Sequence, residues 1–281
     1  MKHYIIITNK GKDPKLEVTK QVESLLEQMG CTSSVYSEES SSAAWVMQPE
    51  ERKAAGILVL GGDGTLLKAA DAASRAGIPV LGINLGTMGY LAEVERCNLR
   101  QALGRLVEED YTVEERMMLS GQVIRQGKLL ESACALSDIT ITRNGHLQML
   151  FFRIFVNGKP LKEYHADGII LATPTGSTGY NMSAGGPIVE PGAKLILLTP
   201  ICPHTLQTRS VILRAEDEIS IRIPERDGRQ NQNVEVCFDG SKNLALCPGD
   251  EVRILKSPRG TPIIKLSEAS FLEVLHRKLS E

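Results

Sequence analysis

Residues 55–77, AGILVLGGDGTLLKAADAASRAG, form the stretch that most restricts how this chain can fold. Residues 57–60 are all apolar and predict a short buried strand, and the glycines of residues 61–64 then interrupt the pattern. Helical spacing resumes over residues 65–76 and stops at Gly77, which Pro79 follows. The stretch therefore predicts a strand, a glycine turn and a helix. Free N–H groups at such a helix N-terminus, next to glycines without Cβ, allow a phosphate to approach the backbone.

One acidic residue, Asp63, lies in this glycine turn. A carboxylate repels phosphate, so its presence there calls for a chemical reason. Two uses fit: it accepts the proton of a hydroxyl that attacks a phosphoryl group, or it holds Mg²⁺ that bridges phosphate oxygens. The structural alternative is a plain Asp-Gly turn. The pattern is not a P-loop, because Gly64 is followed by Thr65 and Leu66 rather than by Lys and Ser or Thr.

The first part of the chain alternates strand and helix patterns. Strands are expected over residues 3–8, 31–36, 57–60 and 78–83, with helices after the first and third of them and a polar loop at residues 37–42 after the second. This order predicts a parallel sheet covered on both faces. Ligands of such sheets bind outside the carboxyl ends of the strands. Because the glycine-spaced loop of residues 84–90 also leaves a strand end, we expect it to form a second wall of the cleft at the glycine turn.

Beyond about residue 111 the apolar period changes to two, which predicts a mostly β region, as a twisted sheet or sandwich. Residues 267–279 regain helical spacing. We therefore predict an α/β domain with a parallel sheet over residues 1–112 and a sandwich-like β domain over residues 113–265. A C-terminal helix over residues 266–281 is expected to return to the first domain.

Composition excludes several classes of protein. The net charge of −2 and the lack of arginine runs argue against a nucleic-acid partner. No apolar run approaches the length of a membrane helix or of a secretory signal. Six scattered cysteines without a CxxC pair indicate reduced thiols, and Cys202 and His204 lack a second ligand pair, so no metal-ligating residues are predicted. We expect a cytoplasmic protein.

The second region contains an unusual stretch at residues 167–187, DGIILATPTGSTGYNMSAGGP. A buried strand runs into a loop in which hydroxyls and glycines alternate, and Tyr180 supplies a flat face on which a base can stack. These groups suit the edges of ribose, adenine and phosphate. A Ser/Thr/Gly turn without a ligand explains any single residue but poorly explains the whole run.

GGDGT at residues 61–65, the stretch at 167–187 and ICPHTL at 201–206 together closely resemble bacterial NAD kinases. GGDGT alone is shared by diacylglycerol kinases and phosphofructokinases, whereas the long second motif is much more specific. The resemblance implies transfer of the γ-phosphoryl group of ATP, or of a polyphosphate phosphoryl group, to the 2′-hydroxyl of the adenosine ribose of NAD, giving NADP. It also implies a divalent cation, with Mg²⁺ expected, and a homodimer or homotetramer.

The resemblance also assigns residues. It makes Asp63 the general base, places Gly64 at the nucleotide and Tyr90 after the second loop of the NAD cleft. Asp138 is assigned to the ribose hydroxyls, and Ser137 stands where the family has Asn. Asp167 faces the nicotinamide end, with His165 in place of a frequent Arg. Lys68 is either a phosphate contact or part of a solvated helix face. The adenosine site is assigned to Thr175, Thr178, Gly179, Tyr180, Asn181, Met182 and Ser183.

Three alternatives remain from the residues themselves. A lipid kinase shares GGDGT but needs an apolar or membrane-seeking face, and no basic amphipathic helix is evident. A phosphofructokinase calls for several arginines near the hydroxyl-rich loop, which has none. A non-catalytic NAD sensor would differ mainly in activity, and Asp63 together with the complete glycine turn favours the enzyme.

Overall fold

The computed structural model describes residues 1–38, 53–86, 89–145, 149–205, 209–224, 233–267 and 269–280. The chain forms two compact units, one made of Met1–Arg116 with Thr261–Glu281 and the other of Met117–Gly260. The sequence-based boundaries were 112/113 and 265/266. The structure assigns residues 112–116 and 261–265 to the first unit, because these segments pair with each other as strands of its sheet.

The first unit is built on one sheet of the described chain. Its strands are β1 (His3–Asn9), β2 (Thr32–Glu38), β3 (Gly56–Gly61), β4 (Val80–Asn84), β5 (Val94–Glu95), β6 (Thr112–Arg116) and β19 (Thr261–Lys265). They run in the order β2-β1-β3-β4-β19-β6, with β5 also paired to β4. The predicted parallel strands are confirmed, but β6 is antiparallel to β19, so the sheet is mixed.

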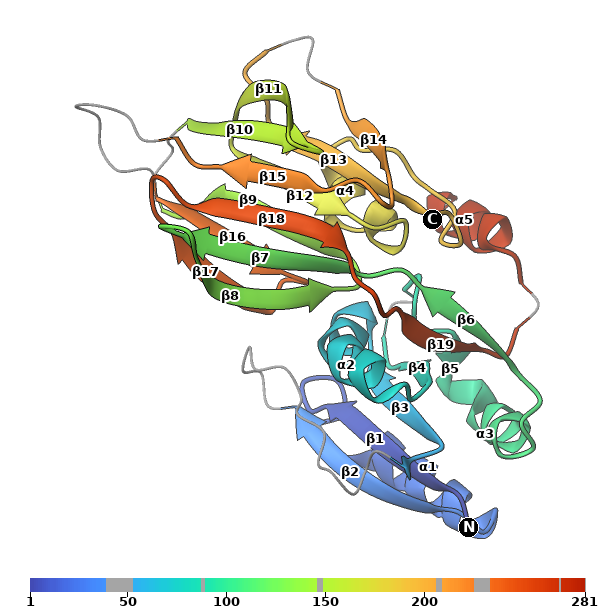
Figure 1. Ribbon diagram of the computed structural model, residues 1–281. Coiled ribbons are helices and arrows are strands. Elements are labelled where there is room, and N and C mark those ends of the chain that lie inside the picture. The colour runs from blue at the N-terminus through green and yellow to red at the C-terminus, as the bar shows by residue number, and fades with distance from the viewer. Residues whose placement is uncertain are drawn as a thin grey trace. The chain divides into compact units, whose positions relative to one another are not determined.

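Helices cover both faces of this sheet (Figure 1). They are α1 (Glu17–Gln28), α2 (Asp63–Ala76) and α3 (Leu99–Val107), with the short η2 (Arg96–Asn98) before α3. A further helix, α5 (Phe271–Leu279), lies near the C-terminus and buries none of its described side chains. Side chains of α1 and α3 share one apolar cluster with alternate residues of β1, β3 and β4, and α2 packs against the other face. Leu66, Ala69, Ala70 and Ala73 of α2 are buried.

The second unit is an antiparallel β sandwich. Its strands are β7 (Leu119–Arg125), β8 (Lys128–Ala135), β9 (Asp138–Arg143), β10 (Leu150–Val156), β11 (Lys159–Ala166), β12 (Gly168–Ala172), β13 (Leu195–Ile201), β14 (Val211–Arg214), β15 (Ile219–Arg222), β16 (Val234–Phe238), β17 (Lys242–Leu246) and β18 (Glu251–Lys256). In the described residues they form two sheets, ordered β11-β10-β15-β18-β7-β8 and β14-β13-β12-β9-β16-β17. A single apolar cluster contains inward residues of both sheets, among them Ile139, Phe152 and Ile254. The predicted sandwich is confirmed.

The side chains of β12 alternate between the two faces of its sheet, and this alternation positions the hydroxyl-rich loop. Ile169 and Leu171 point into the sandwich core, whereas Ile170 and Ala172 face the opposite side of the sheet. Ala184 and Val189, which follow β12 in the chain, pack on that second face. The loop after β12 therefore lies on the outside of its sheet, held there by an apolar contact of its own.

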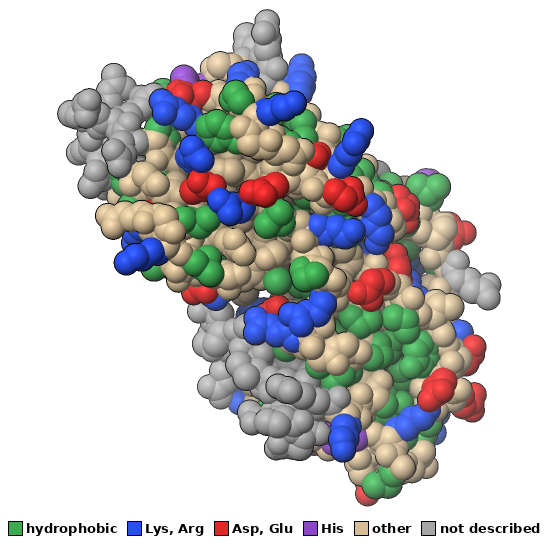
Figure 2. Space-filling model, in the orientation of Figure 1, with side chains coloured by type: hydrophobic (Ala, Val, Ile, Leu, Met, Phe, Trp, Pro, Cys, Tyr) green, Lys and Arg blue, Asp and Glu red, His purple; other side chains and the backbone are tan. Residues whose placement is uncertain are grey.

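The outer face of the other sheet is a surface of paired charges. Figure 2 shows Lys and Arg side chains interspersed with Asp and Glu across the side that contains β15 and β18. Arg222 lies 3.1 Å from Glu251, and Arg253 lies 3.1 Å from Glu218. Such alternation is typical of a solvated sheet face. In the described part of the chain, every helix is too short or too polar to cross a membrane.

Candidate active site

Asp63 is fixed at the N-terminus of α2 by the loop that follows β4. Its Oδ2 accepts a hydrogen bond from the backbone N–H of Tyr90 at 2.8 Å. Its Oδ1 accepts hydrogen bonds from the N–H groups of Leu91 and Ala92 at 3.1 and 3.2 Å. Because both oxygens are held by backbone, the carboxylate has a defined direction rather than a solvated range of rotamers.

Gly89 makes this approach possible. A Cβ at Gly89 would lie 1.9 Å from Asp63 Oδ1, far inside any real contact distance. The structure thus brings together the two glycine loops that the sequence placed at neighbouring strand ends. Thr87 and Met88 of the second loop, like Leu206 of the third motif, lie outside the described residues.

The other predicted residues of the first unit lie close in sequence to Asp63. Gly64 is exposed in the first turn of α2, and a Cβ there would meet nothing within 4 Å. Lys68 is half-buried one turn further along and has an interaction partner, so it is not a free solvated side chain. Tyr90 is half-buried, and burial, assisted by the Asp63 charge, raises the pKa of its hydroxyl.

In the second unit, the loop after β12 is tied to the segment that precedes β9. The Thr173 hydroxyl donates to the carbonyl of Leu136 at 2.6 Å and accepts from the N–H of Gly176 at 3.1 Å. A Cβ at Gly176 would lie 2.2 Å from the carbonyl oxygen of Ser137. These contacts hold the hydroxyl-rich loop against Ser137 and Asp138.

Ser137 and Asp138 are themselves organised by a further acid, Asp239. One oxygen of Asp239 accepts the N–H of Leu136 at 2.7 Å, and the other accepts those of Ser137 and Asp138 at 2.8 and 3.1 Å. The Ser137 hydroxyl donates to Asp138 Oδ2 at 2.6 Å. Burial raises the pKa of Asp138, and burial raises the pKa of Asp239 to about 7 although its three N–H donors favour the charged form.

The residues assigned to the adenosine site follow on η3 (Thr175–Thr178) and α4 (Tyr180–Ser183). Tyr180 is 46% exposed, so its ring is open to a stacking partner, and partial burial raises the pKa of its hydroxyl. Gly179 and Ser183 are exposed, Thr178 and Met182 are half-buried, and Thr175 is buried. A Cβ at Gly179 would make only ordinary contacts of 3.4 Å or more.

Asn181, unlike the residues on either side of it, is held inside the loop. It is fully buried, and its amide nitrogen donates to the carbonyls of Ser177 and Pro187 at 3.1 and 3.0 Å. Its Oδ1 accepts the hydroxyl of Thr199, on β13, at 2.7 Å. The side chain assigned to the adenosine site thus links the loop to the sheet and does not face outward.

Asp167 and His165, assigned near the nicotinamide end, are held separately. Arg143 lies 3.3 Å from Asp167 Oδ2. His165 Nε2 lies 3.3 Å from Glu163 Oε1, and its ring packs edge-on against Phe151. Asp167 is half-buried just before β12, whereas His165 is engaged by partners on β10 and β11.

Sequence reasoning missed Asp239, and it did not single out Gly89. Asp239 begins an Asp-Gly turn directly after the strand pattern of residues 234–238, and its φ of +48° fits such a turn. Gly89 gives no local signal, because its role arises only where the two glycine loops meet. Within the described ranges, no three His, Cys, Asp or Glu side chains gather as metal ligands.

These features define a class: a kinase of the GGDGT type, with an α/β unit that carries the acid and a β sandwich that carries a loop rich in hydroxyls and glycines. The sequence profile of the ATP-NAD kinase N-terminal domain matches residues 5–111, and that of the C-terminal domain matches residues 136–266. The chain therefore belongs to the ATP-NAD kinase family, and NAD kinase is the enzymatic function that this membership supports.

Individual relatives agree with the family profiles. The chain is 40% identical over 286 residues to the NAD kinase of Lachnoclostridium phytofermentans, covering 100% of both chains. An NAD kinase from Archaeoglobus fulgidus, solved in complex with ATP, is 26% identical with a TM-score of 0.79, over 99% of each chain. A yeast NADH kinase solved with NADH shares the fold, with a TM-score of 0.83 and 24% identity over 99% of this chain and 88% of that one. Membership in this family sets aside the lipid kinase and phosphofructokinase alternatives.

Proposed function

We propose that this chain transfers the γ-phosphoryl group of ATP to the 2′-hydroxyl of the adenosine ribose of NAD, forming NADP. The observation that supports the proposal most directly is the Asp63 carboxylate, fixed in a glycine turn at the N-terminus of α2. A phosphate-binding element and a proton acceptor thus occupy the same few residues. That combination is what phosphoryl transfer to a hydroxyl requires.

Asp63 supplies the base. A ribose hydroxyl is a poor nucleophile at neutral pH, so its proton must leave as the new P–O bond forms. A carboxylate has roughly four lone-pair sites, and three N–H groups occupy three of them, leaving one for the hydroxyl. General-base assistance of this kind contributes roughly 10²–10⁴-fold, and alignment supplies most of the remainder.

The second unit supplies the groups proposed to bind NAD. Asp138 is the acceptor proposed for the ribose hydroxyls, and the exposed ring of Tyr180 is the proposed platform for adenine. The Ser137 hydroxyl, bonded to Asp138, takes the place of the family's amide and orients that carboxylate. Asp167 is the group proposed at the nicotinamide end.

The donor is proposed to arrive as Mg²⁺–ATP. Mg²⁺ takes most of its ligands from water and substrate phosphates rather than from an all-protein cage, so the cation belongs with the substrate. All six cysteines are free thiols, which agrees with a reducing cytoplasm. The family resemblance also leads us to expect a homodimer or homotetramer, which light scattering of the purified protein would test.

An acceptor panel tests the proposed reaction. Purified protein with Mg²⁺–ATP is offered NAD, a diacylglycerol or fructose 6-phosphate in separate reactions, and the phosphorylated product is identified by mass spectrometry. We expect phosphate on NAD alone. Phosphate on either other acceptor would contradict the proposed function, and binding of NAD without any product would indicate the NAD sensor instead.

A further inference from the structure

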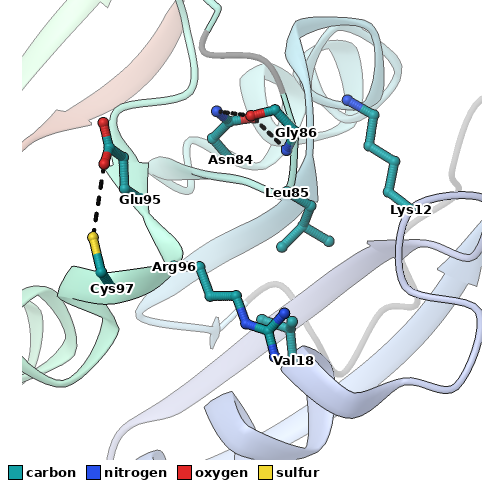
Figure 3. A pocket seen from close by; sticks show the side chains of 8 residues that line it. All are labelled: Lys12, Val18, Asn84, Leu85, Gly86, Glu95, Arg96 and Cys97. Atoms are coloured by element: carbon teal, nitrogen blue, oxygen red, sulfur yellow. Dashed lines mark hydrogen bonds between the residues drawn. The ribbon is translucent and has the colours of Figure 1, made fainter.

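The first unit contains a cavity of about 430 Å³ beside the loop that follows β4 (Figure 3). Lys12 lines it, and a Cβ on Gly62 would lie 2.8 Å from the Lys12 ammonium nitrogen, so the cavity adjoins the glycine turn and belongs to the site already described. In the second unit, by contrast, Asp239 has no part in the proposed reaction. The hydrogen bonds of its carboxylate run to the segment that contains Asp138.

Strand pairing brings Asp239 to Asp138, although the two are 101 residues apart in the chain. Strands β16 and β9 are antiparallel, with Phe238 opposite Ile139, so the turn after β16 meets the segment before β9. The Asp239 N–H donates to the Asp138 carbonyl at 3.0 Å, and the φ angle of Asp239, +48°, then begins the turn into β17. This turn therefore lies directly against residues 136–138.

The Asp239 carboxylate fixes backbone rather than side chains. It accepts three consecutive N–H groups, those of Leu136, Ser137 and Asp138, at 2.7, 2.8 and 3.1 Å. Three donors on one carboxylate restrict this segment to one conformation, so Asp138 is in place before a ligand arrives. The Ser137 hydroxyl, which donates to Asp138 Oδ2 at 2.6 Å, then sets the direction of that side chain.

The hydroxyl-rich loop rests on the same segment. The Thr173 N–H donates to the Ser137 carbonyl at 2.9 Å, in addition to the hydrogen bond from the Thr173 hydroxyl to Leu136. Gly176 packs so closely that a Cβ there would lie 2.6 Å from the Ser137 carbonyl carbon. A shift of residues 136–138 therefore moves the start of η3 and the loop that follows it.

Asp138 and Asp239 form a pair of adjacent acids. In the part of the chain that the structure describes, neither carboxylate forms an ion pair with Lys or Arg. Burial raises the pKa of both carboxyls, and the charge of Asp138 adds to the rise that brings the pKa of Asp239 to about 7. The Ser137 hydroxyl favours the charged form of Asp138. At pH values just below about 7, Asp239 therefore holds a proton and the negative charge of the pair lies on Asp138.

The neighbouring ionisable groups do not compete for this proton. Burial raises the pKa values of the Cys237 thiol and the Tyr180 hydroxyl above their ordinary ranges, so both groups stay neutral. Glu235 and Lys242, on the adjoining strands β16 and β17, are engaged with other side chains at 3.1 and 3.0 Å. Asp239 is thus the group expected to titrate near neutral pH at this place.

We propose that Asp239 is a positioning residue for NAD, because it places both Asp138 and the hydroxyl-rich loop where the adenosine half of NAD binds. The inference rests on the proposed function for the identity of the ligand. With Asp239 protonated, the ribose hydroxyls donate to one charged acceptor, Asp138. When Asp239 ionises, bound NAD covers two adjacent like charges and removes the water around them, so NAD affinity falls as pH rises through about 7.

Calorimetric titration of NAD into the whole protein, at several values from about pH 6 to about pH 8.5, tests this role. The wild type is compared with Asp239→Asn, which keeps the uncharged form, and with Asp250→Asn. Asp250 is a matched control, because it is a buried acid of the same unit that also accepts a backbone N–H, at 2.7 Å, outside this segment. We expect the wild-type Kd for NAD to rise about 3–10-fold over the range. Asp239→Asn should show no such rise, and Asp250→Asn should follow the wild type.

Asp239→Ala removes the acceptor altogether and separates positioning from charge. In steady-state assays the folded variant should raise the KM for NAD about 10–100-fold, with the KM for ATP within about twofold of wild type. Asp239→Asn keeps one oxygen that accepts N–H groups, so it should restore most of the affinity for NAD. Where Asp239→Ala does not fold, the pH profiles of the other two variants decide.

The same pH dependence of NAD affinity in the wild type and Asp239→Asn would overturn the inference. So would a wild-type affinity that rises with pH, or an equal rise of both KM values in folded Asp239→Ala. NAD binding with the expected profile but without phosphorylation of NAD would contradict the proposed function and leave the role of Asp239 standing. Phosphorylation of NAD with a Kd that does not depend on pH would do the reverse.

Discussion

Gly89 approaches the Asp63 carboxylate so closely that a Cβ there would lie 1.9 Å from Oδ1. Either the loop or the acid must move when this glycine is replaced. We expect Gly89→Ala to lower kcat about 10²-fold or more, because the carboxylate of the proposed base is displaced from its orientation. We also expect it to lower the free energy of unfolding by about 1–3 kcal/mol through overpacking. Steady-state kinetics and urea unfolding measure the two effects.

Gly104→Ala is the matched control for that substitution, because a Cβ at this helical position meets nothing within 4 Å. It should keep kcat and leave stability unchanged or slightly higher. Normal turnover by Gly89→Ala would show that the hydrogen bonds from the loop do not position the carboxylate for catalysis.

Asp239 gives a prediction for pH. Its pKa is raised from 3.8 to about 7, chiefly by burial. Between those values the folded protein keeps a proton that the unfolded chain has lost, so the contribution of Asp239 to stability falls as pH rises. The free energy of unfolding of wild type minus that of Asp239→Asn should therefore decrease from about pH 4 to about pH 7 and then level off.

Urea unfolding of both proteins across this range measures that difference. A difference that grows with pH would mean that the three N–H donors outweigh burial and lower the pKa of Asp239 instead. The carboxylate would then be the stable form around neutrality.

At the scale of single elements, the loop formed by η3 and α4 depends on Asn181. Asn181→Ala removes the two donated hydrogen bonds and the one accepted from Thr199. It leaves buried polar groups unpaired, so we expect a loss of about 2–4 kcal/mol in the free energy of unfolding. Chemical denaturation measures the loss, and NAD affinity should fall along with the order of the loop.

Ser183→Ala serves as its counterpart, because Ser183 is exposed on the same helix. Its effect should be confined to NAD binding, with stability within about 0.5 kcal/mol of wild type. An Asn181→Ala variant that keeps full stability and loses only NAD affinity would show that Asn181 contacts NAD directly.

A helix or strand can be predicted from the sequence when the residues that define it are adjacent in the chain. The apolar run at residues 57–60, the glycine turn and the stop at Gly77 correspond to β3 and α2 as observed. The side-chain environments are less predictable. Asn181 has the composition of a ligand-binding residue, and only the position of Thr199 on β13 shows that its amide is already occupied.

At the scale of the whole molecule, the sequence indicates two domains and a return of the chain, but not the strand that makes the return. From the sequence, residues 261–265 are indistinguishable from another strand of the β region, because the sequence pattern of a strand does not reveal which strand it pairs with. In the structure they form β19, which lies between β4 and β6 in the first unit. Non-local pairing decides such boundaries, as it decides the approach of Gly89 to Asp63 and of Asp239 to Ser137.

A chain that ends at Gly260 tests this return. It lacks β19 and the buried side chains of Ile263, Ile264 and Leu266. At about 1.5–3 kcal/mol for each side chain, the loss is comparable to the whole stability of a typical domain. Hydrogen exchange should show lost protection in β1, β3 and β4, with β9, β12 and β13 still protected.

Retained protection in both units of the shortened chain would contradict the role given to β19. Loss in both units would show that the second unit depends on the first for its stability.

The most direct test of the account is the turnover of Asp63→Asn. The amide keeps the shape of the side chain but cannot accept the ribose proton. We predict that kcat for NAD phosphorylation falls by at least about 10²-fold while the Kd for NAD, measured by calorimetry, stays within about twofold of wild type. Near-normal turnover by Asp63→Asn would contradict the account, because another group would then take the proton.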